Sequence, residues 1–352
     1  MTVVFEKGRN WFSQKLPFVL YCKPNSNKLV GIFQKNDALF EITDYTETGF
    51  AFVSFDGKNK YLIPKKESDV YIVTVTETDS FIDSEVDLHY NLEAKVAFEH
   101  LVAKGIQAIE KNQFKKVVLS RKETLEIERF DFEIMLKKLF FNYPNTLKYC
   151  FYHPKIGLWI GATPEQFLQS FGNTIKTVSF AGTQPYSETK DYVWEEKERQ
   201  EQQFVTDFIL ESLNKYSEEV YCSKPYTFRA GSIVHIKTDI EATINTKDFQ
   251  EIIEKLHPTP AVCGLPKEIA KQFIIENEGY NRTFYTGFLG ELNIDFETFQ
   301  EPKSDLFVNL RCMNLEDNKI NVYVGCGITK DSIPEKEFIE TVNKSKTMKK
   351  VV

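Results

Sequence analysis

Short apolar segments separated by turn residues fill the first quarter of the chain. The runs FVLYC, LVGIF, FAFVSF, KYLIP and VYIVTV lie between residues 18 and 75, and the turn sequences PNSN and DGKN separate some of them. Runs of four to eight residues that are rich in branched and aromatic side chains indicate β-strands when turn residues bound them. Residues 15–85 are therefore predicted to form a meandering antiparallel sheet.

Beyond residue 90 the apolar spacing switches between a helical and a strand period. Helical spacing predicts helices over 91–112, 131–142, 247–256, 266–277 and 334–346. Strand patterns cover 115–127, 147–154, 157–164, 226–244, 286–294, 305–315 and 320–329, and 167–172 pairs with 174–180 as a hairpin across Gly-Asn. This irregular alternation, in which hairpins dominate, predicts an α+β fold rather than regular βαβ units.

The segment WEEKERQEQQFVTDFIL, residues 194–210, predicts a further long helix that starts after the N-cap candidates Ser187 and Thr189. A helical projection places Glu201 on an apolar face and Glu198 one turn back on its flank. The apolar side chains of that face are Trp194, Phe204, Val205 and Phe208. A carboxylate on such a face is costly unless it is paired, so Glu201 needs a partner.

A second pair of glutamates repeats this spacing on the last predicted helix. Glu337 and Glu340 are three residues apart, and Lys344 follows one turn later. Two carboxylate pairs that converge on one hard cation would suit Mg²⁺, which prefers oxygen ligands. The alternative is a charged helix face in water, and for Glu337 and Glu340 it stays open because the apolar neighbours lie away from them.

Two further polar residues stand at the ends of apolar strands. Lys116 precedes VVLSR and is either a strand-end lysine that reaches solvent or a desolvated amine able to act as a base. Glu165 follows the strand LWIGATP and is either an exposed turn acid or a carboxyl whose pKa an apolar setting raises toward that of a general acid.

Three more positions have both a structural and a functional interpretation. Gly325 and Gly327 interrupt the apolar strand VYVGCGIT, which indicates a bulge or a close backbone approach to an anion. Arg311 in VNLRC fits a carboxylate ligand or a structural ion pair. His235 in SIVHIK is most often a buried core histidine, and no Ser-His-Asp, Cys-His, Walker or G-x-G-x-x-G motif is present.

Composition narrows the class of protein. The chain has 352 residues, 42% of them hydrophobic, and a net charge of −7 with scattered basic residues, which argues against nucleic acid as a partner. No signal region or long apolar run is present, so we expect no membrane contact and a cytoplasmic location. The separated cysteines indicate reduced thiols. We expect a monomer with one domain over 1–352, in which a strand-rich part (1–90) precedes a motif-bearing part (91–352).

Eight motifs agree in order and spacing with one known family. KVVLSR, GATPE, FAGT, EEKERQEQ, LHPTPAVCG, NLRC, VGCGI and EKEFIETVNK resemble the motifs of chorismate-utilising enzymes over about residues 90–350. This family includes isochorismate synthases, salicylate synthases and the chorismate-binding subunits of anthranilate and aminodeoxychorismate synthases. The resemblance implies a single α+β domain in which two large antiparallel sheets pack face to face, helices lie outside, and the active site occupies a cleft.

The resemblance also implies roles for individual residues. Lys116 matches the base that activates water for attack at C2 of chorismate, and Glu165 matches the acid that protonates the departing 4-hydroxyl. Mg²⁺ would hold the ring carboxylate, with Glu201 and Glu340 as ligands and Glu198 and Glu337 in the acidic shell. The remaining matched positions contact the substrate: Gly182, Thr183 and Lys344 near the ring carboxylate, His235 and Ala261 in the ring pocket, and Tyr285, Arg311 and Gly325 at the enolpyruvyl carboxylate.

Two positions separate the members of this family. Anthranilate synthases resemble this chain but carry glutamine where Lys116 stands, and aminodeoxychorismate synthases carry a lysine nucleophile where FAGT has Ala181. Both positions favour water, so the leading hypothesis is a Mg²⁺-dependent isochorismate synthase, an isomerase of menaquinone or siderophore biosynthesis. A salicylate synthase, which also eliminates pyruvate, and a non-catalytic chorismate-binding protein are the alternatives.

Overall fold

The structure is a computed structural model that describes residues 2–75, 90–128, 130–188, 191–217, 219–230 and 233–352. Its helices are α1 (Thr2–Ser13), α2 (Leu92–Glu110), α3 (Phe132–Asn142), α4 (Glu196–Leu213), α5 (Phe249–Leu256), α6 (Lys267–Asn277), α7 (Pro334–Lys349) and the short 3₁₀ turns η1 (Lys65–Glu67) and η2 (Thr246–Asp248). Among the described residues, no helix has the length and apolar character needed to cross a membrane.

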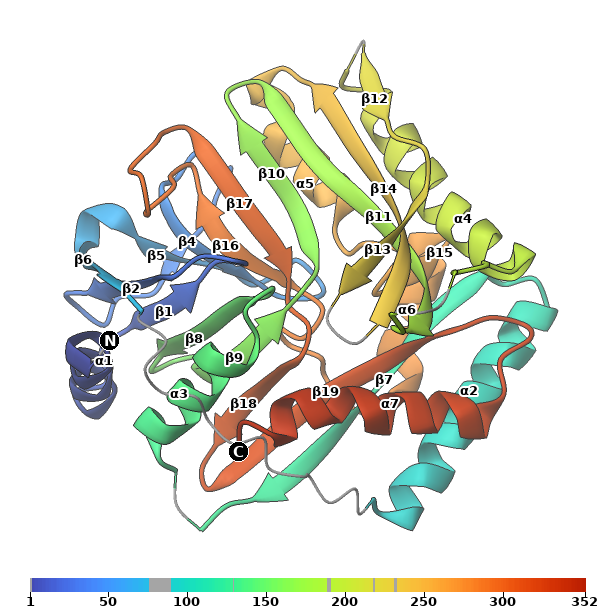
Figure 1. Cartoon of the computed structure of the whole chain (residues 1–352), viewed down its shortest axis with the longest axis horizontal. Coiled ribbons are helices and arrows are strands. Elements are labelled where there is room, and N and C mark those ends of the chain that lie inside the picture. The colour runs from blue at the N-terminus through green and yellow to red at the C-terminus, as the bar shows by residue number, and fades with distance from the viewer. Residues whose placement is uncertain (1, 76–89, 129, 189–190, 218, 231–232) are drawn as a thin grey trace.

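Two antiparallel sheets contain the strands (Figure 1). Sheet A has the order β15 (Gly264–Leu265), β7 (Lys116–Glu126), β19 (Lys319–Ile328), β18 (Cys312–Glu316), β9 (Gly157–Thr163), β8 (Leu147–His153), β1 (Phe18–Cys22), β2 (Lys28–Gln34), β6 (Ser68–Thr74). Sheet B has the order β12 (Val220–Cys222), β14 (Ile233–Thr243), β11 (Thr174–Pro185), β10 (Gln166–Phe171), β17 (Lys303–Val308), β16 (Phe288–Leu292), β4 (Gly49–Val53), β5 (Lys60–Pro64), β3 (Phe40–Glu41), and β13 (Tyr226–Ala230) pairs with β14. The predicted α+β class with two antiparallel sheets and flanking helices is confirmed.

The sheets pack face to face through a largely aromatic core. Tyr149, Phe151 and Trp159 of sheet A meet Phe52 and Leu289 of sheet B, and all are almost fully buried. The ring centroids of Phe52 and Phe151 lie 4.3 Å apart in a stacked arrangement. Aromatic side chains bury large apolar areas, so this layer supplies much of the free energy that joins the two sheets.

The N-terminal strands do not form the single meander that the sequence predicted. β1, β2 and β6 belong to sheet A, whereas β3, β4 and β5 belong to sheet B. The prediction was wrong because the alternation of apolar residues identifies strands but does not say which strands pair. The first quarter of the chain therefore lies across both sheets, and β1 and β4 pair with β8 and β16 from later parts of the sequence.

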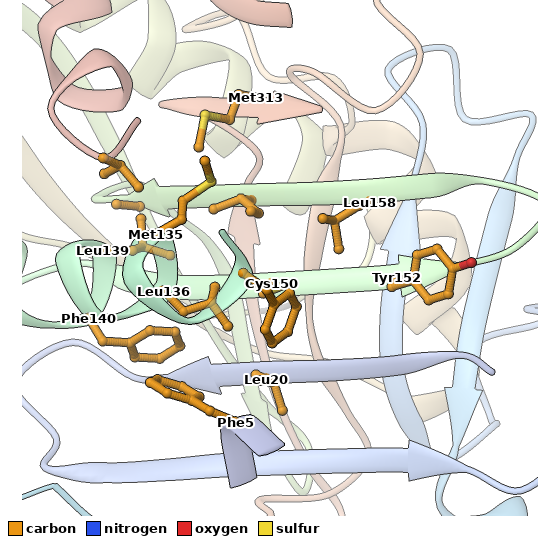
Figure 2. Close-up of a cluster of buried hydrophobic side chains, with 14 of the residues drawn as sticks. Phe5, Leu20, Met135, Leu136, Leu139, Phe140, Cys150, Tyr152, Leu158 and Met313 are labelled. Carbon is orange, nitrogen blue, oxygen red and sulfur yellow. The ribbon is translucent and has the colours of Figure 1, made fainter. Parts of the chain in front are cut away.

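Helices cover the outer faces of both sheets (Figure 1). On sheet A, α1 and α3 enclose one cluster, in which the rings of Phe5 and Phe140 face each other with centroids 5.9 Å apart and Met135, Leu136 and Leu139 point at β8 and β9 (Figure 2). At the other end of sheet A, α2, α6 and α7 pack over β7 and β19 around a second cluster. On sheet B, α4 and α5 cover a third.

Two segments predicted as single strands are each divided. The described residues 226–230 and 233–243 form the antiparallel pair β13–β14. Residues 305–315 form β17 in sheet B and β18 in sheet A, so the chain crosses between the sheets at 309–311. Arg311 lies at this crossing with a φ of 47°, a conformation that is uncommon outside glycine. The crossing places Arg311 between the sheets instead of within a strand.

Helices α1 and α4 also differ from the predictions. No helix was predicted at residues 2–13, where α1 lies. The predicted helix after Ser187 begins only at Glu196: Glu195 is the N-cap, and Glu198 completes a capping box with it. The other predicted cap, Thr189, lies outside the described residues. Trp194 therefore precedes α4 and does not share its apolar face.

Candidate active site

A cavity of about 710 Å³ between the two sheets collects residues from distant parts of the sequence. Its walls come from β7, β11, β14, β19, α4, α7 and the loops around residues 165, 261, 285 and 311. We call it the central cavity. Among the residues predicted for the site, these line it: Lys116, Glu165, Gly182, Glu198, Glu201, His235, Ala261, Tyr285, Arg311, Gly325, Glu337, Glu340, Lys344. The side chain of Thr183 lies outside what the structure describes.

Lys116 opens β7 and points into the central cavity rather than to solvent. Its side chain is 6% exposed, and its Nζ lies 2.6 Å from Oε1 of Glu201. The neighbouring Lys115 is exposed and faces away, as the alternation of a strand requires. Gly327 pairs with Val118 on the adjacent strand, and a Cβ there would lie 3.2 Å from Cε of Lys116. A residue larger than glycine would therefore crowd the amine.

The glycines of β19 do not mark a bulge. β19 pairs with β7 in one uninterrupted register from Lys319 to Ile328. A Cβ on Gly325 would lie 2.8 Å from a backbone oxygen of β7 and 3.0 Å from the hydroxyl of Tyr285. The close approach seen here is to protein groups, and the approach of an anion to this backbone stays a prediction.

Glu165 occupies the turn between β9 and β10 and its carboxyl faces the central cavity. The backbone N–H of Glu165 donates a hydrogen bond to Thr163 Oγ1 at 3.3 Å. The backbone carbonyl of Glu165 accepts one from the Val308 N–H at 2.9 Å. Burial raises the pKa of this carboxyl to about 7, although the nearby cations Lys116, Lys344 and Arg311 act in the opposite direction. A carboxyl with this pKa holds a proton that it can donate near neutral pH.

The four glutamates predicted around the metal share the central cavity, and for Glu201, Glu340 and Glu198 the protein partners are as follows. Glu201 contacts Lys116, Glu340 Oε1 lies 2.6 Å from Lys344 Nζ, and Glu198 accepts a hydrogen bond from the Glu195 N–H at 2.9 Å. Glu337 and Glu340 are half-buried at the cavity wall, which disfavours the water-facing alternative.

The donor set fits Mg²⁺ by its chemistry. The four carboxylates offer only oxygen atoms, which Mg²⁺ prefers, and they come from two helices, α4 and α7, on the wall of one cavity. Within the described part of the chain, no three His, Cys, Asp or Glu side chains are grouped closely enough to hold an ion. Lysines hold two of the carboxylates instead, and a bound cation would have to compete with them.

Lys344, Arg311 and the hydroxyl of Tyr285 lie at another part of the cavity wall. Lys344 Nζ donates a hydrogen bond to the Gly325 carbonyl at 3.0 Å, and Arg311 Nη1 approaches the Lys344 carbonyl at 3.5 Å. Burial lowers the pKa of Arg311, opposed by Tyr285, Glu340 and Glu165. A guanidinium that is partly withdrawn from water gains from an anionic partner, and its planar fork matches a carboxylate.

His235 faces the cavity beside a bulge of β11. The register of β11 with β14 shifts between Ala181 and Gln184, and Gly182 within this bulge has a φ of 69°. The carbonyl of Gly182 lies 2.7 Å from His235 Nδ1. A carbonyl only accepts, so Nδ1 carries the hydrogen and Nε2 is the acceptor. Burial lowers the pKa of His235, which keeps the ring neutral.

Sequence reasoning missed several residues of the site. Gln184 donates to the Val193 carbonyl at 3.1 Å and lies 3.4 Å from Oε2 of Glu198. Cys326 lines the same wall as the two matched glycines around it. Gln184 carried a weak signal, because it follows FAGT directly, but Cys326 had none, since an apolar residue is expected in a buried strand.

Comparisons with known proteins identify the family of this chain. Residues 63–352 match the family model described as chorismate binding enzyme. The isochorismate synthase EntC of Escherichia coli is 30% identical over 268 residues, which cover 72% of this chain and 66% of that protein. The isochorismate synthase MenF of Escherichia coli is 28% identical over 195 residues, 53% of this chain and 44% of that protein. The alignments thus span less than two thirds of these relatives.

The fold has a close structural counterpart. The menaquinone-specific isochorismate synthase MenF from Escherichia coli superposes with a TM-score of 0.79 over 96% of this chain and 89% of that one, at 19% identity. At this identity the likeness establishes the shared architecture of two sheets, while the family model carries the assignment to a family.

Proposed function

The chain belongs to the chorismate binding enzyme family, and from this premise we propose that it is an isochorismate synthase, which converts chorismate to isochorismate. The observation that carries the proposal is the presence of a lysine and a carboxylic acid, Lys116 and Glu165, on the wall of one cavity of about 710 Å³. Replacement of an allylic hydroxyl by water needs a base for the water and an acid for the departing hydroxyl. The similarity to EntC and MenF supports the same reaction.

Lys116 and Glu165 together account for every proton transfer in the proposed step. Lys116 accepts a proton from the water whose oxygen bonds to C2, and both ring double bonds shift, from C1=C2 to C1=C6 and from C5=C6 to C4=C5, as the C4–oxygen bond breaks. Glu165 gives its proton to the departing 4-hydroxyl, which leaves as water. One water is consumed and one is released, so the overall reaction is an isomerisation, and the raised pKa of Glu165 supplies the acid near neutral pH.

The ion pair of Lys116 with Glu201 has to open for this step. An ammonium that donates to a carboxylate has no lone pair with which to accept a proton from water. The 2.6 Å contact therefore describes a resting arrangement. We assign the working role of Glu201, with Glu340, Glu198 and Glu337 around it, to holding Mg²⁺, which would supply positive charge for the ring carboxylate of the substrate.

The side chains at the other wall orient the substrate. Arg311 and the Tyr285 hydroxyl are assigned to the enolpyruvyl carboxylate, with the backbone at Gly325 beside them. Lys344 and Gly182, with Thr183, are assigned to the ring carboxylate end. The neutral His235 and Ala261 are placed at the ring face. These groups fix the dianion so that C2 and the 4-hydroxyl face Lys116 and Glu165, which lowers the entropy cost of the step.

Product analysis in isotopically labelled water tests the proposal. The protein is incubated with chorismate and Mg²⁺ in H₂¹⁸O. The products are separated by chromatography, and their masses are determined by mass spectrometry. We expect isochorismate with one ¹⁸O at C2 and no salicylate. Salicylate with pyruvate would replace the proposal by a salicylate synthase, and unchanged chorismate would reject catalysis in favour of a binding protein.

Adjacent lysines provide a matched pair of variants for the base. Lys116→Gln is expected to abolish formation of labelled isochorismate, because an amide does not accept the proton of water. Lys115→Gln changes an exposed residue that immediately precedes β7, and it is expected to retain the wild-type rate. Equal rates in the two variants would remove Lys116 from the reaction. Glu201→Gln should weaken the Mg²⁺ dependence in a metal titration.

A further inference from the structure

A fully buried ion pair lies directly behind the wall of the central cavity. The side chains of Glu278 and Arg282 are 0% and 2% exposed, and Arg282 Nη2 lies 2.5 Å from Glu278 Oε1. A second contact joins Nε to Oε2 at 2.7 Å. Neither residue lines the cavity itself. Buried ion pairs contribute little net stability, because desolvation offsets their attraction. Stability alone therefore does not explain why this pair lies behind the cavity wall.

The side chains of Glu278 and Arg282 form hydrogen bonds with β7 beyond the point where the edge strand β15 ends. On one side β7 pairs with β19 over its whole length, but on the other side β15 pairs only with Lys116 and Val117. The Val118 N–H still donates to the Cys263 carbonyl. Beyond that point Arg282 Nη2 donates to the Val118 carbonyl at 2.7 Å and Glu278 Oε1 accepts from the Ser120 N–H at 2.7 Å. Two side chains thus replace the hydrogen bonds of a missing strand.

The same guanidinium also reaches two other walls of the cavity. Arg282 Nη1 donates to the Val262 carbonyl at 2.9 Å and to Thr286 Oγ1 at 3.1 Å. Together with the bonds to Glu278 and Val118, all five N–H donors of the guanidinium are engaged. A lysine has three donors and no planar fork, and so cannot reproduce this set.

Each segment held by the guanidinium carries a residue of the proposed active site. Val118 is two residues after Lys116, Val262 follows Ala261, and Thr286 follows Tyr285. Val118, Val262 and Thr286 themselves line the central cavity. One buried group thereby fixes the relative positions of three parts of the cavity wall that lie far apart in sequence, from Val118 to Thr286.

We infer that Glu278 and Arg282 form a positioning pair that sets where the Lys116 amine stands relative to the substrate. The inference rests on the proposed function for its kinetic readout, but not for its structural one. Neither residue touches the substrate. Displacing a reacting group by about 1 Å is enough to lower a rate about 100-fold, and β7 is the element that carries the base.

Arg282→Lys tests the inference because it keeps the buried charge pair while it removes at least two donors. We expect kcat to fall by about tenfold or more while KM changes less than about threefold, because the displaced amine acts in the chemical step. Amides of residues 117–121 should exchange with deuterium faster than in the wild type, whereas those of β1 should not. Glu278→Asp, which keeps the charge and withdraws the carboxylate from the Ser120 N–H, should show the same pattern and serves if Arg282→Lys does not fold.

A second buried ion pair supplies the matched control. Glu291 is paired with Lys23 at 2.6 Å and lies outside the central cavity. Glu291→Gln should lower Tm with kcat unchanged. If Arg282→Lys lowers Tm and leaves both kcat and local exchange at wild-type values, the pair is only structural and the inference is overturned. A wild-type protein that leaves chorismate unchanged rejects the proposed function, and the exchange of residues 117–121 then decides the inference alone.

Discussion

Glu165 and Glu291 are two carboxyl groups with the same perturbation and different surroundings. Burial raises the pKa of each to about 7, from an ordinary value of 4.5. Glu291 lies 2.6 Å from Lys23 Nζ, accepts a hydrogen bond from the Tyr21 hydroxyl at 2.5 Å, and accepts another from the Phe296 N–H at 3.1 Å. Its oxygens are committed to neighbours that hold β1 against β16.

The carboxyl of Glu165 is free of such commitments. Within the residues that the structure describes, it makes no hydrogen bond or ion pair, and Lys116, Lys344 and Arg311 act on it only through their charge. It also faces a cavity, which Glu291 does not. The comparison teaches that a raised pKa does not by itself identify a catalytic acid. An available oxygen beside space for a substrate is the additional requirement.

Substitution of each carboxyl by its amide should separate the two roles most strongly. Glu165→Gln is expected to lower kcat by about 10²- to 10⁴-fold, the usual contribution of a general acid, with Tm unchanged or slightly raised. Glu291→Gln should keep kcat within about twofold, because its neighbours are structural. Steady-state kinetics and thermal unfolding of the purified variants check this, and equal losses of kcat in both would erase the distinction.

The pH dependence of the rate should follow only one of the two groups. Ionisation of Glu165 removes the acid, so it should act against kcat/KM on the basic side of a pKa near 7 and produce an inflection there. This inflection should persist in Glu291→Gln and be missing from the residual activity of Glu165→Gln. The same inflection in Glu165→Gln would contradict the role of Glu165.

Stability should respond to Glu291 in a way that depends on pH. Its pKa is raised in the folded state, so the native protein binds more protons than the unfolded chain between about pH 4.5 and about pH 7. Its contribution to the free energy of unfolding therefore falls as pH rises through that window. Glu291→Gln should cost about 1–3 kcal/mol at pH 5 through its lost hydrogen bonds.

That cost should shrink toward pH 7, because the wild type alone loses stability over the interval. Urea unfolding at pH 5, 6 and 7 measures the difference between the two proteins directly. A difference that grows with pH would mean that the ion pair with Lys23 outweighs burial, and that the pKa of Glu291 is lowered instead of raised.

The sequence predicted individual elements better than their pairing. Alternation located the strands around Phe52 and Tyr149, but the same alternation fits one sheet or two, because pairing depends on distant partners. The segment around Arg311 shows the limit most clearly. Its apolar pattern continues across residues 305–315, while the chain leaves sheet B after Val308 and enters sheet A at Cys312. No local pattern records that exchange.

Residues of the candidate site were predictable where a charged side chain occupies a position that the apolar pattern marks as buried. Glu201 on an apolar helix face and Lys116 before a buried strand both signalled a polar cavity, and both line it. The family resemblance added Glu340, which its own helix left undecided. Glu278 and Arg282 gave no signal, since an acid and a base four residues apart are common on exposed helices. Their role depends on where β15 ends, which is a property of the folded sheet.

The mixed origin of the two sheets bears on how the chain tolerates shortening. The family match starts at residue 63, inside β5, so a fragment that begins there lacks β1, β2 and β4. Without them β8 and β16 become open edges, and the inner aromatic residues Tyr149 and Phe151 lose their cover. Unpaired edge strands of this kind recruit strands from other molecules. The N-terminal strands thus cover an edge of each sheet, and we expect a fragment that begins at residue 63 to aggregate more readily than the whole chain.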